Sequence, residues 1–344
     1  MARVKTFFIA LLLLLIAAAG ALWFGWNSLN SAPERQAMTS ELFTVEQGEV
    51  VAETAVDLHE QGLIRSPLFF RVLSRIQRVR NGNGTIKAGR YHIRPGSSSL
   101  EIYKLLVEGK QELVKITIPE GLTARRIARS FAEKGITEES GFLDAVHSSD
   151  LIRKYQVPAD SLEGYLYPDT YYFQQDYPAE EIVDHLVGTF FEKLEEIRER
   201  APGQLNPEEL HRKIILASIV EREYRDPDEA DKIASVFYNR LEQNMRLQSC
   251  ATVVYAMTEE KGLPHPKRLT YGDLELESQF NTYIKGGLPP GPIANPGYVA
   301  LQAAFQPAET DYLYFLLKDQ EAGRHVFSNN LAEHNQAYTL YIKQ

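Results

Sequence analysis

Cysteine is almost absent from this chain of 344 residues, which contains only Cys250. A single cysteine excludes an internal disulfide framework and any zinc cluster built on cysteines. The chain also lacks the GxxxxGK[ST] phosphate loop, the GxSxG nucleophile elbow and the HExxH zinc helix. Its eight histidines are scattered, and the closest pair, His325 and His334, is too far apart to share one helical turn. We therefore expect no metal site and no cofactor.

Basic residues are in deficit, with 37 Lys and Arg against 46 Asp and Glu and a net charge of −9. This balance argues against nucleic acid as a partner. The remaining composition, 44% hydrophobic and 24% charged, is ordinary for a globular protein. It excludes a wholly disordered chain, a collagen-like repeat and a multi-span membrane protein. At roughly 150 residues per domain, the chain has room for about two domains beyond its N-terminal segment.

The N-terminal segment contains 21 consecutive residues without charge, residues 6–26. As a helix this run would measure ~31 Å, the thickness of the hydrocarbon core of a bilayer. Arg3 and Lys5 precede it, whereas only Arg35 is basic in the following twenty residues. The positive-inside rule then predicts a cytoplasmic N-terminus and an exported remainder, with the anchor in the cytoplasmic (inner) membrane.

The same segment also permits a cleaved signal peptide, with residues 7–16 as its apolar region and residues 19–21 as a cleavage site of small residues. We favour an uncleaved anchor because the apolar run continues through residues 22–24. Trp23 and Trp26 also suit the outer interface of a membrane. Both interpretations place the bulk of the chain outside the cytoplasm.

Residues 1–26 are thus expected to form a cytoplasmic stub and an anchor, followed by a polar linker over residues 27–40. After the linker, a β-like run, a glycine, an amphipathic helix and a closing glycine recur three times, ending at Gly62, Gly109 and Gly135. A closing glycine suits a left-handed helix end. Hydroxyl residues suited to capping the second and third helices are Ser97, Ser98, Ser99 and Thr123. The three copies indicate small strand–helix units.

A basic stretch separates the first two copies. Residues 65–94 contain eight Lys or Arg and no Asp or Glu. One interpretation is a surface that faces anionic lipid headgroups or an anionic polymer. The other is a solvated helix face that carries Arg71, Arg75 and Arg78, which are three to four residues apart. The sequence leaves both open.

The rest of the chain mixes helices and antiparallel strands without βαβ alternation, which predicts an α+β fold. Helices are expected at 180–200, 208–225 and 331–341, and two strands at 312–318 and 325–328, joined by a loop with Gly323. Residues 286–297 hold four glycines and four prolines, which exclude a regular element there. Such a stiff loop often forms the wall of a cleft.

One carboxylate is unusual. Residues 214–220 contain a single polar residue, Ser218, so this helix is apolar on all sides and should be buried. Glu221 continues its apolar stripe, and loss of hydration there raises the pKa of the carboxyl group, as a general acid near neutral pH requires. Alternatively, Glu221 is the first exposed residue after the helix and pairs with Arg225. Glu223 is expected on the opposite face, in solvent.

Several segments resemble the YceG-like family of membrane-anchored endolytic murein transglycosylases. They are TIPEGLTARRIA at 117–128, LEGYLYPDTY at 162–171, LASIVEREYRDP from Leu216, FNTY at 280–283, GLPPGPIANPG at 287–297 and HVFSNNLAEHN at 325–335. The resemblance covers essentially the whole exported chain, in order. It implies a small LysM-like, glycan-binding strand–helix module over residues 41–115 and a mixed α+β catalytic domain over residues 116–344.

The resemblance also assigns Glu221 the role of the single catalytic acid/base. The implied reaction is non-hydrolytic cleavage of the β-1,4 bond between N-acetylmuramic acid (MurNAc) and N-acetylglucosamine (GlcNAc) inside a glycan strand. The product carries a 1,6-anhydroMurNAc end, and the length of glycan strands is limited as a result. Peptidoglycan strands and the membrane are the implied partners, and wall-synthesis or division proteins are further candidates.

Gln248, Asn281 and Tyr283 are the candidate substrate contacts, because amides and a phenol hydrogen-bond sugar hydroxyls and acetamido groups. Asn281 could instead cap a turn, and Tyr283 could belong to the core. Glu163 is a weaker second carboxylate candidate, of a kind more typical of a loop or a cap. Where the family commonly has an acid, this chain has Cys250, whose thiol we expect to be packed or partly buried. This substitution argues against a general base there and leaves open how the neighbouring loop is held.

Two other classes of function stay open. A muramidase-type hydrolase would leave reducing ends instead of anhydro ends. A non-enzymatic module would bind glycan and tether wall-synthesis proteins to the membrane, which the strand–helix units, the anchor and the basic stretch would serve. A membrane-surface lipid-binding protein is a third, more distant interpretation.

Overall fold

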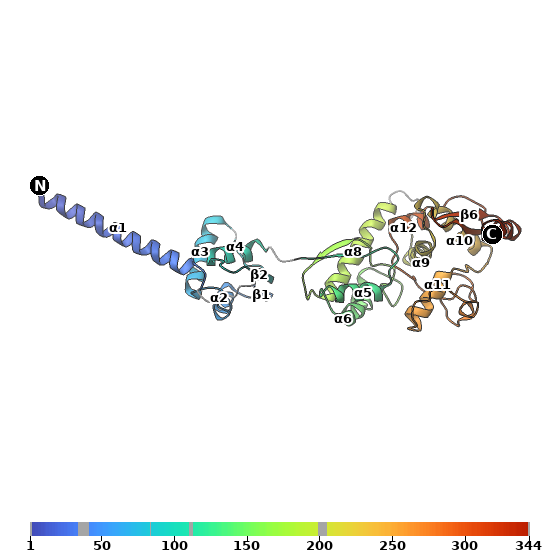
Figure 1. Cartoon of the computed structure of the whole chain (residues 1–344), viewed down its shortest axis with the longest axis horizontal. Helices are drawn as coiled ribbons and strands as arrows, with labels where there is room; N and C mark the ends of the chain where they lie inside the picture. The colour runs from blue at the N-terminus through green and yellow to red at the C-terminus, as the bar shows by residue number, and fades with distance from the viewer. Residues whose placement is uncertain (1, 34–40, 83, 110–112, 199–204, 343–344) are drawn as a thin grey trace. The chain divides into compact units, whose positions relative to one another are not determined.

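The computed structural model describes residues 2–33, 41–82, 84–109, 113–198 and 205–342 (Figure 1). The chain divides into two compact units, Met1–Leu113 (unit 1) and Val114–Gln344 (unit 2), and each has its own hydrophobic core. The described strands form three separate antiparallel sheets of two strands each. Helices combined with small antiparallel sheets confirm the predicted α+β class.

Unit 1 begins with α1 (Ala2–Asn30), whose residues Leu12–Asn30 are long and apolar enough to cross a membrane. The helix continues past residue 26, so the first residues of the predicted linker are helical instead. Its end packs on the rest of the unit. The Trp26 ring lies 4.9 Å from that of Phe69, and Asn30 Oδ1 accepts a hydrogen bond from the backbone N–H of Leu100. Residues 34–40 of the predicted linker lie outside the described residues.

The two strands of unit 1 pair with each other, β1 (Glu41–Val45) with β2 (Gly89–Ile93). Helices α2 (Val51–Glu60) and α3 (Pro67–Asn81) lie between them in the chain, and α4 (Ser99–Glu108) follows. Their core includes Phe43, Leu58, Phe70 and Tyr91, all with no exposed surface. The first two predicted strand–helix units therefore share one sheet instead of forming separate units.

Two of the predicted capping hydroxyls, Ser98 and Thr123, cap their helices, whereas the buried Ser99 hydroxyl does not. The Ser98 hydroxyl accepts a hydrogen bond from the backbone N–H of Glu101 at the start of α4, and Gly109 ends that helix in the left-handed conformation. In unit 2, the Thr123 hydroxyl accepts a hydrogen bond from the Arg126 N–H at the start of α5 (Ala124–Glu133). A capping hydroxyl satisfies one of the N–H groups that lack a partner in the first turn of a helix.

Unit 2 contains the other two sheets. β5 (Tyr314–Asp319) pairs with β6 (Arg324–Ser328) as predicted, whereas the pairing of β3 (Val114–Thr117) with β4 (Thr170–Phe173) joins segments that the sequence did not connect. The predicted helices are present as α8 (Ala179–Arg198), α9 (Pro207–Glu223) and α13 (Leu331–Tyr341). Further helices and short turns are α6 (Glu139–Val146), α7 (Ser149–Lys154), η1 (Pro227–Glu229), α10 (Ala230–Glu242), α11 (Cys250–Tyr255), η2 (Ala256–Glu260), η3 (Asp273–Glu275) and α12 (Tyr298–Phe305).

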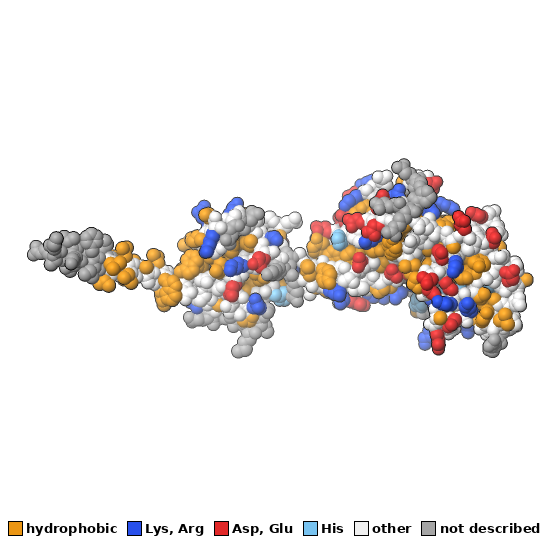
Figure 2. Space-filling model, turned by 90° about the horizontal axis from the view of Figure 1, so that it is seen from above, with side chains coloured by type: hydrophobic (Ala, Val, Ile, Leu, Met, Phe, Trp, Pro, Cys, Tyr) orange, Lys and Arg blue, Asp and Glu red, His pale blue; other side chains and the backbone are white. Residues whose placement is uncertain are grey.

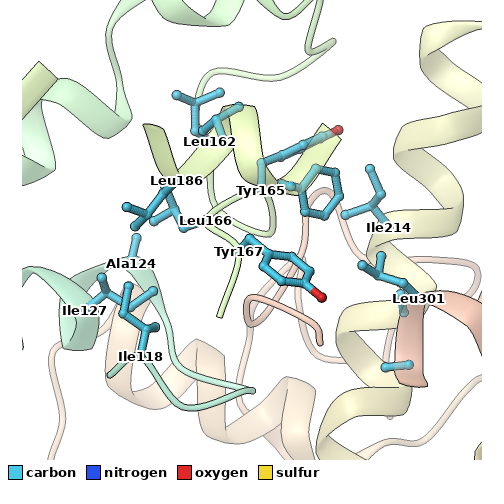
Figure 3. Close-up of a cluster of buried hydrophobic side chains, with 14 of the residues drawn as sticks. Ile118, Ala124, Ile127, Leu162, Tyr165, Leu166, Tyr167, Leu186, Ile214 and Leu301 are labelled. Atoms are coloured by element: carbon cyan, nitrogen blue, oxygen red, sulfur yellow. The ribbon is translucent and has the colours of Figure 1, made fainter. Parts of the chain in front are cut away.

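The core of unit 2 surrounds α9, which packs against α10, α11 and α12. In Figure 3, Tyr165 extends toward Ile214 of α9, and Tyr167 extends toward Leu301 of α12. Leu166, between these two tyrosines in the chain, lies on the side of Leu186. Residues 286–297 form no helix or strand, as their glycines and prolines predicted, and they follow an irregular path to the start of α12.

Candidate active site

The candidate site is built around the last turn of α9. The helix starts at Pro207, where Asn206 and Glu209 form a capping box, and it ends at Glu223. Its central residues, such as Ile214 and Ala217, have no exposed surface. The helix is therefore buried, as predicted. The next carboxylate on its apolar stripe is partly buried.

That carboxylate belongs to Glu221, whose Oε2 accepts a hydrogen bond of 3.0 Å from the backbone N–H of Gly297. Burial raises the pKa of Glu221 to about 7, and the negative charge of Glu120 acts in the same direction. The Gly297 N–H and the positive charge of Arg222 oppose this rise in pKa. A substantial fraction of the group is therefore protonated at neutral pH, as predicted. Its hydrogen-bond partner is Gly297, not the predicted alternative partner Arg225.

A second carboxylate, which the sequence did not single out, lies beside this group. Glu120 precedes Gly121 in the TIPEG segment, and a Cβ atom placed on Gly297 would overlap the Glu120 carboxyl group. A Cβ atom placed on Gly121 would lie 3.5 Å from Glu221 Cγ. Glu120 and Glu221 therefore flank the same glycine. Glu120 is exposed, whereas Glu221 is partly buried.

Asn295 holds the end of the proline- and glycine-rich loop. Its Oδ1 accepts hydrogen bonds from the backbone N–H groups of Gly164 and Leu166, at 2.8 and 2.9 Å. Its Nδ2 donates to the Leu122 carbonyl and to Glu163 Oε1, at 2.9 and 2.8 Å. The side chain is completely buried, and its oxygen and its nitrogen each take part in two hydrogen bonds. Sequence reasoning identified the loop but not this residue.

Glu163 belongs to the same scaffold. Both of its carboxylate oxygens accept hydrogen bonds of 3.0 Å from the backbone N–H of Ala124, the first residue of α5. Burial raises the pKa of Glu163 to about 8, and the bonds from Ala124 and Asn295 oppose this rise. These contacts fit the cap interpretation of Glu163 and not a second catalytic carboxylate.

Two of the predicted substrate contacts lie close together beside the start of α11. Gln248 is exposed, and its backbone N–H donates to the Thr282 carbonyl at 3.2 Å. Tyr283 is half-buried, and its Oη lies 3.1 Å from Cys250 Sγ. Cys250 is exposed as a residue, because α11 begins there on the surface of the unit, but burial raises the pKa of its thiol, which fits the partly buried position expected and not a packed one.

Asn281, the third predicted contact, has no exposed surface. Its Nδ2 donates to the carbonyls of Leu274 and Leu276, and its Oδ1 accepts from the backbone N–H of Tyr283. All of these partners are backbone groups of neighbouring turns. The side chain is therefore out of reach of a ligand, and the turn-capping alternative describes it.

Glu223 was expected in solvent, and this prediction is wrong. The Ser249 hydroxyl donates to Glu223 Oε1 at 2.5 Å, and burial raises the pKa of Glu223. The physical reason is the packing of α11 against the end of α9, which covers the face that the helix alone leaves open. The backbone N–H of Ser249 also donates to Thr282 Oγ1. These contacts hold the loop before Cys250 without an acid at position 250.

Comparisons with known proteins agree on one family. A model of the YceG-like family matches residues 43–339. An endolytic murein transglycosylase of Bacillus subtilis is 32% identical over 339 residues, which cover 94% of this chain and 90% of that protein. The chain belongs to the YceG-like family. The matched residues extend from β1 to α13, so family membership includes both compact units.

Two further relatives agree with this assignment. An endolytic murein transglycosylase of Streptococcus pneumoniae is 28% identical, with 99% of this chain and 66% of that protein covered. The crystal structure of a YceG-like protein from Listeria monocytogenes matches with a TM-score of 0.57 and 32% identity. That match covers 87% of this chain and 99% of the other. Among the described residues, no group of three or more His, Cys, Asp or Glu side chains is arranged to hold a metal ion.

Proposed function

We propose that this YceG-like protein is an endolytic lytic transglycosylase of peptidoglycan. It cleaves the β-1,4 bond between MurNAc and GlcNAc within a glycan strand, leaves a 1,6-anhydroMurNAc end and so limits strand length. The observation that carries the proposal is Glu221, a carboxyl group with a pKa of about 7, bonded to Gly297 of the stiff loop. The names of the relatives in Bacillus and Streptococcus support the same substrate and reaction class.

In the proposed reaction, Glu221 acts first as acid and then as base. Its Oε2 is held by the Gly297 N–H, so the other oxygen carries the proton toward the glycosidic oxygen. As the bond between C1 of MurNAc and O4 of GlcNAc breaks, this proton passes to O4, and positive charge develops at C1. The Glu221 carboxylate then takes the proton of the MurNAc C6 hydroxyl, whose oxygen closes onto C1. No water enters the product.

Gln248 and Tyr283 are the substrate contacts that we propose. The exposed Gln248 amide can bond a sugar hydroxyl or acetamido group, and the half-buried Tyr283 ring can pack on a pyranose face. Both lie beside the loop before Cys250. This loop is held at the end of α9 by the hydrogen bond from Ser249 to Glu223, and Glu223 follows the catalytic acid by two residues. Asn281 contributes by holding the backbone of Tyr283.

We also propose that α1 is a single-pass anchor in the cytoplasmic (inner) membrane, with the N-terminus inside, and that unit 2 and the part of unit 1 after α1 lie outside. The apolar stretch Leu12–Asn30 and the basic residues before it support this orientation. The part of the chain from residue 41 to residue 115 would then be the LysM-like glycan-binding module, which the chain order β1, α2, α3, β2 and the antiparallel pairing of its strands support. Wall-synthesis or division proteins are the further partners that we predict for such an anchored enzyme.

The central test is digestion of purified peptidoglycan sacculi by the protein and by its Glu221→Gln variant. We expect the wild type to release fragments with 1,6-anhydro ends, which mass spectrometry distinguishes from reducing ends by the missing water. The variant should lose activity by about a hundredfold or more, because its amide cannot donate a catalytic proton. It should still bind sacculi. Equal cleavage by the variant would remove Glu221 from the mechanism, and binding without any cleavage by the wild type would favour the tether.

The second carboxylate favours one alternative, a muramidase-type hydrolase. Hydrolytic glycosidases use a pair of carboxyl groups, one as acid and one as base or nucleophile, and Glu120 lies next to Glu221 at Gly297. In that mechanism Glu120 activates a water and the products carry reducing ends. The same mass spectra decide between the two reactions. A Glu120→Gln variant that keeps releasing anhydro ends would support the transglycosylase.

A further inference from the structure

Unit 2 is strongly acidic, yet four arginines and a single carboxylate line one of its cavities. Residues 114–344 contain 24 Lys and Arg against 36 Asp and Glu. The cavity measures about 440 Å³, and its lining includes residues of α5, of the end of α9 and of α11. Its charged lining consists of Arg125, Arg126, Arg129, Arg222, His265 and Glu259. We call this cavity the arginine pocket.

The arginine pocket adjoins the catalytic acid. Arg222 directly follows Glu221, and its Nη1 donates to the carbonyl of Gly121 at 3.2 Å. Gly121 and Arg222 both line the pocket, and Gly121 also packs against the Glu221 side chain. A group bound in the arginine pocket therefore lies next to the sugar whose linkage Glu221 is proposed to cleave.

The positive charge of the arginine pocket is only partly neutralised. Arg125 Nε donates to the single carboxylate of the lining, Glu259, at 3.1 Å. Arg129 lies 4.0 Å from Glu139 at its nearest atoms, a distance too long for a hydrogen bond. Among the described residues, the Arg126 guanidinium has no hydrogen-bond or ion-pair partner. A guanidinium group without a protein partner favours a planar anion that accepts two parallel hydrogen bonds.

We propose that the arginine pocket binds carboxylate groups of peptidoglycan on the muramic acid side of the cleaved bond. This proposal rests on the proposed function and names the part of the substrate that the sugar contacts do not address. Two sources share this chemistry: the carboxylates of the peptide stems and the lactyl carboxylate of a muramic acid that has lost its stem. Neutral glycan is bound less well, and the difference decreases with salt, because the pocket is open to solvent and its charges are screened.

The test compares three substrates: strands with native stems, strands whose stem carboxyl groups have been converted to amides, and strands stripped of stems by an amidase. Binding to the full-length Glu221→Gln protein is measured for each, so that the result does not depend on cleavage. We expect native strands to bind about tenfold more tightly than amidated strands. Tight binding of stripped strands as well would assign the pocket to the lactyl carboxylate.

The variant that addresses the arginine pocket is Arg126→Gln/Arg129→Gln, and Arg153→Gln on the exposed surface of α7 is its matched control. The double variant should lose the preference for native over amidated strands, and the control should keep it. In the active protein the double variant should raise KM more than it lowers kcat. An unchanged preference in the double variant would overturn the proposal. Absence of cleavage by the wild type would instead contradict the proposed function and leave the binding result valid.

A second, independent observation concerns α3 in unit 1. Arg71, Arg75 and Arg78 are exposed along this helix, which agrees with the predicted helix face. The aliphatic side chains of Val72, Ile76 and Val79 alternate with them and are 46, 43 and 85% exposed. On the face of unit 1 that Figure 2 presents, basic side chains lie among hydrophobic ones. An exposed helix with both kinds of residue is typical of a helix that lies at a membrane interface.

The position of α3 relative to the anchor supports a membrane partner. Phe69 in the first turn of α3 packs against Trp26 of α1, near the outer end of the apolar stretch, and Arg65 Nε donates to the Ala32 carbonyl. We infer that the exposed face of α3 contacts the headgroups of anionic lipids, with its arginines on phosphates and its aliphatic side chains at the acyl boundary. A soluble polymer offers no apolar layer for Val72, Ile76 and Val79.

This inference is tested with the full-length protein in lipid nanodiscs. A fluorescent bimane label at Val79→Cys, in a Cys250→Ser background, should be quenched by spin-labelled lipids in discs that contain phosphatidylglycerol. A label at Val56→Cys, an exposed position on α2, serves as the control and should not be quenched. Quenching at position 79 should decrease in zwitterionic discs and in the variant Arg71→Gln/Arg75→Gln/Arg78→Gln. Equal quenching at positions 79 and 56, or no effect of lipid charge, would overturn the inference.

Discussion

At the scale of single residues, the candidate site depends on the unequal environments of two carboxyl groups beside one glycine. Glu221 is partly buried and bonded to the Gly297 N–H, and its pKa is about 7. Glu120 is exposed. A group with a pKa near the working pH can both donate and accept a proton, as a single acid/base must. The negative charge of Glu120 contributes to this balance by disfavouring ionisation of Glu221.

The first prediction uses this balance. Activity that requires protonated Glu221 should fall as the pH rises through about 7. Glu120→Gln removes a charge that raises the pKa of Glu221, so the falling limb of kcat/KM should move to lower pH. Arg222→Gln removes a charge that lowers this pKa, so the limb should move to higher pH. The measurement is kcat/KM against pH for the three proteins, and limbs that coincide would contradict the electrostatic account.

Sequence reasoning predicted the acid but not its neighbours. Glu221 is recognisable because it continues a local helical stripe of apolar residues, and local periodicity is visible in a sequence. Glu120 and Asn295 are not recognisable from the sequence, because each acts through contacts with segments more than a hundred residues away. For Glu223 the local pattern was misleading, since the face that it occupies is covered by α11.

At the scale of elements, the active-site loop is positioned by its packing on the segment before β4. Gly164 has a φ of 90°, which side chains rarely adopt, and a Cβ atom there would overlap the Pro292 ring. We expect Gly164→Ala to destabilise unit 2 by about 2–4 kcal/mol, the sum of backbone strain and overlap. Gly135→Ala is the control, because Gly135 has a φ of 65° and no atom within 4 Å of the added Cβ. It should lose only about 1 kcal/mol in thermal or chemical denaturation.

Asn295 and Asn281 allow a matched comparison between a buried amide that supports the acid and one that does not. Both are completely buried and fully hydrogen-bonded. Asn295→Ala and Asn281→Ala should each destabilise the protein by about 2–4 kcal/mol, because buried backbone groups lose their partners. Only Asn295→Ala should loosen Gly297, whose N–H lowers the pKa of Glu221.

The pH profile separates the two variants. The falling limb of activity should move to higher pH in Asn295→Ala and stay in place in Asn281→Ala. A shift of the limb in both variants would mean that general loosening of the unit, and not the loop that contains Gly297, determines the pKa of Glu221.

The helices and strands show the same contrast: features set by local sequence were predicted, and features set by contacts with distant segments were not. Helices α8, α9 and α13 were predicted to within a few residues, because their periodicity and caps are local. The pairing of β3 with β4 was not predicted, since the two strands are separated by three helices, α5, α6 and α7. The α1 helix extends past its predicted end because Trp26 and Asn30 pack on unit 1, which hydropathy alone does not indicate.

At the scale of the whole molecule, the buried residues that the structure describes form two cores that share no residue. One consists of residues between Phe43 and Leu106, and the other of residues between Ile116 and Phe305. Separate cores generally unfold as separate cooperative units. Glycan binding, which we propose for unit 1, and cleavage in unit 2 should therefore respond independently to mutations that weaken one core.

The last prediction tests this independence. Phe70 and Phe190 are both completely buried, the first in unit 1 and the second in unit 2. Phe70→Ala should destabilise its own unit by about 3–5 kcal/mol. In hydrogen–deuterium exchange, amides of α2 and β2 should then exchange faster, while those of α9 keep their protection, and cleavage of short soluble strands should persist. Phe190→Ala should show the reverse pattern and reduce cleavage. Faster exchange in α9 of the Phe70→Ala protein, to the extent seen in α2, would mean that the two cores unfold together and that the anchored unit is part of the catalytic scaffold.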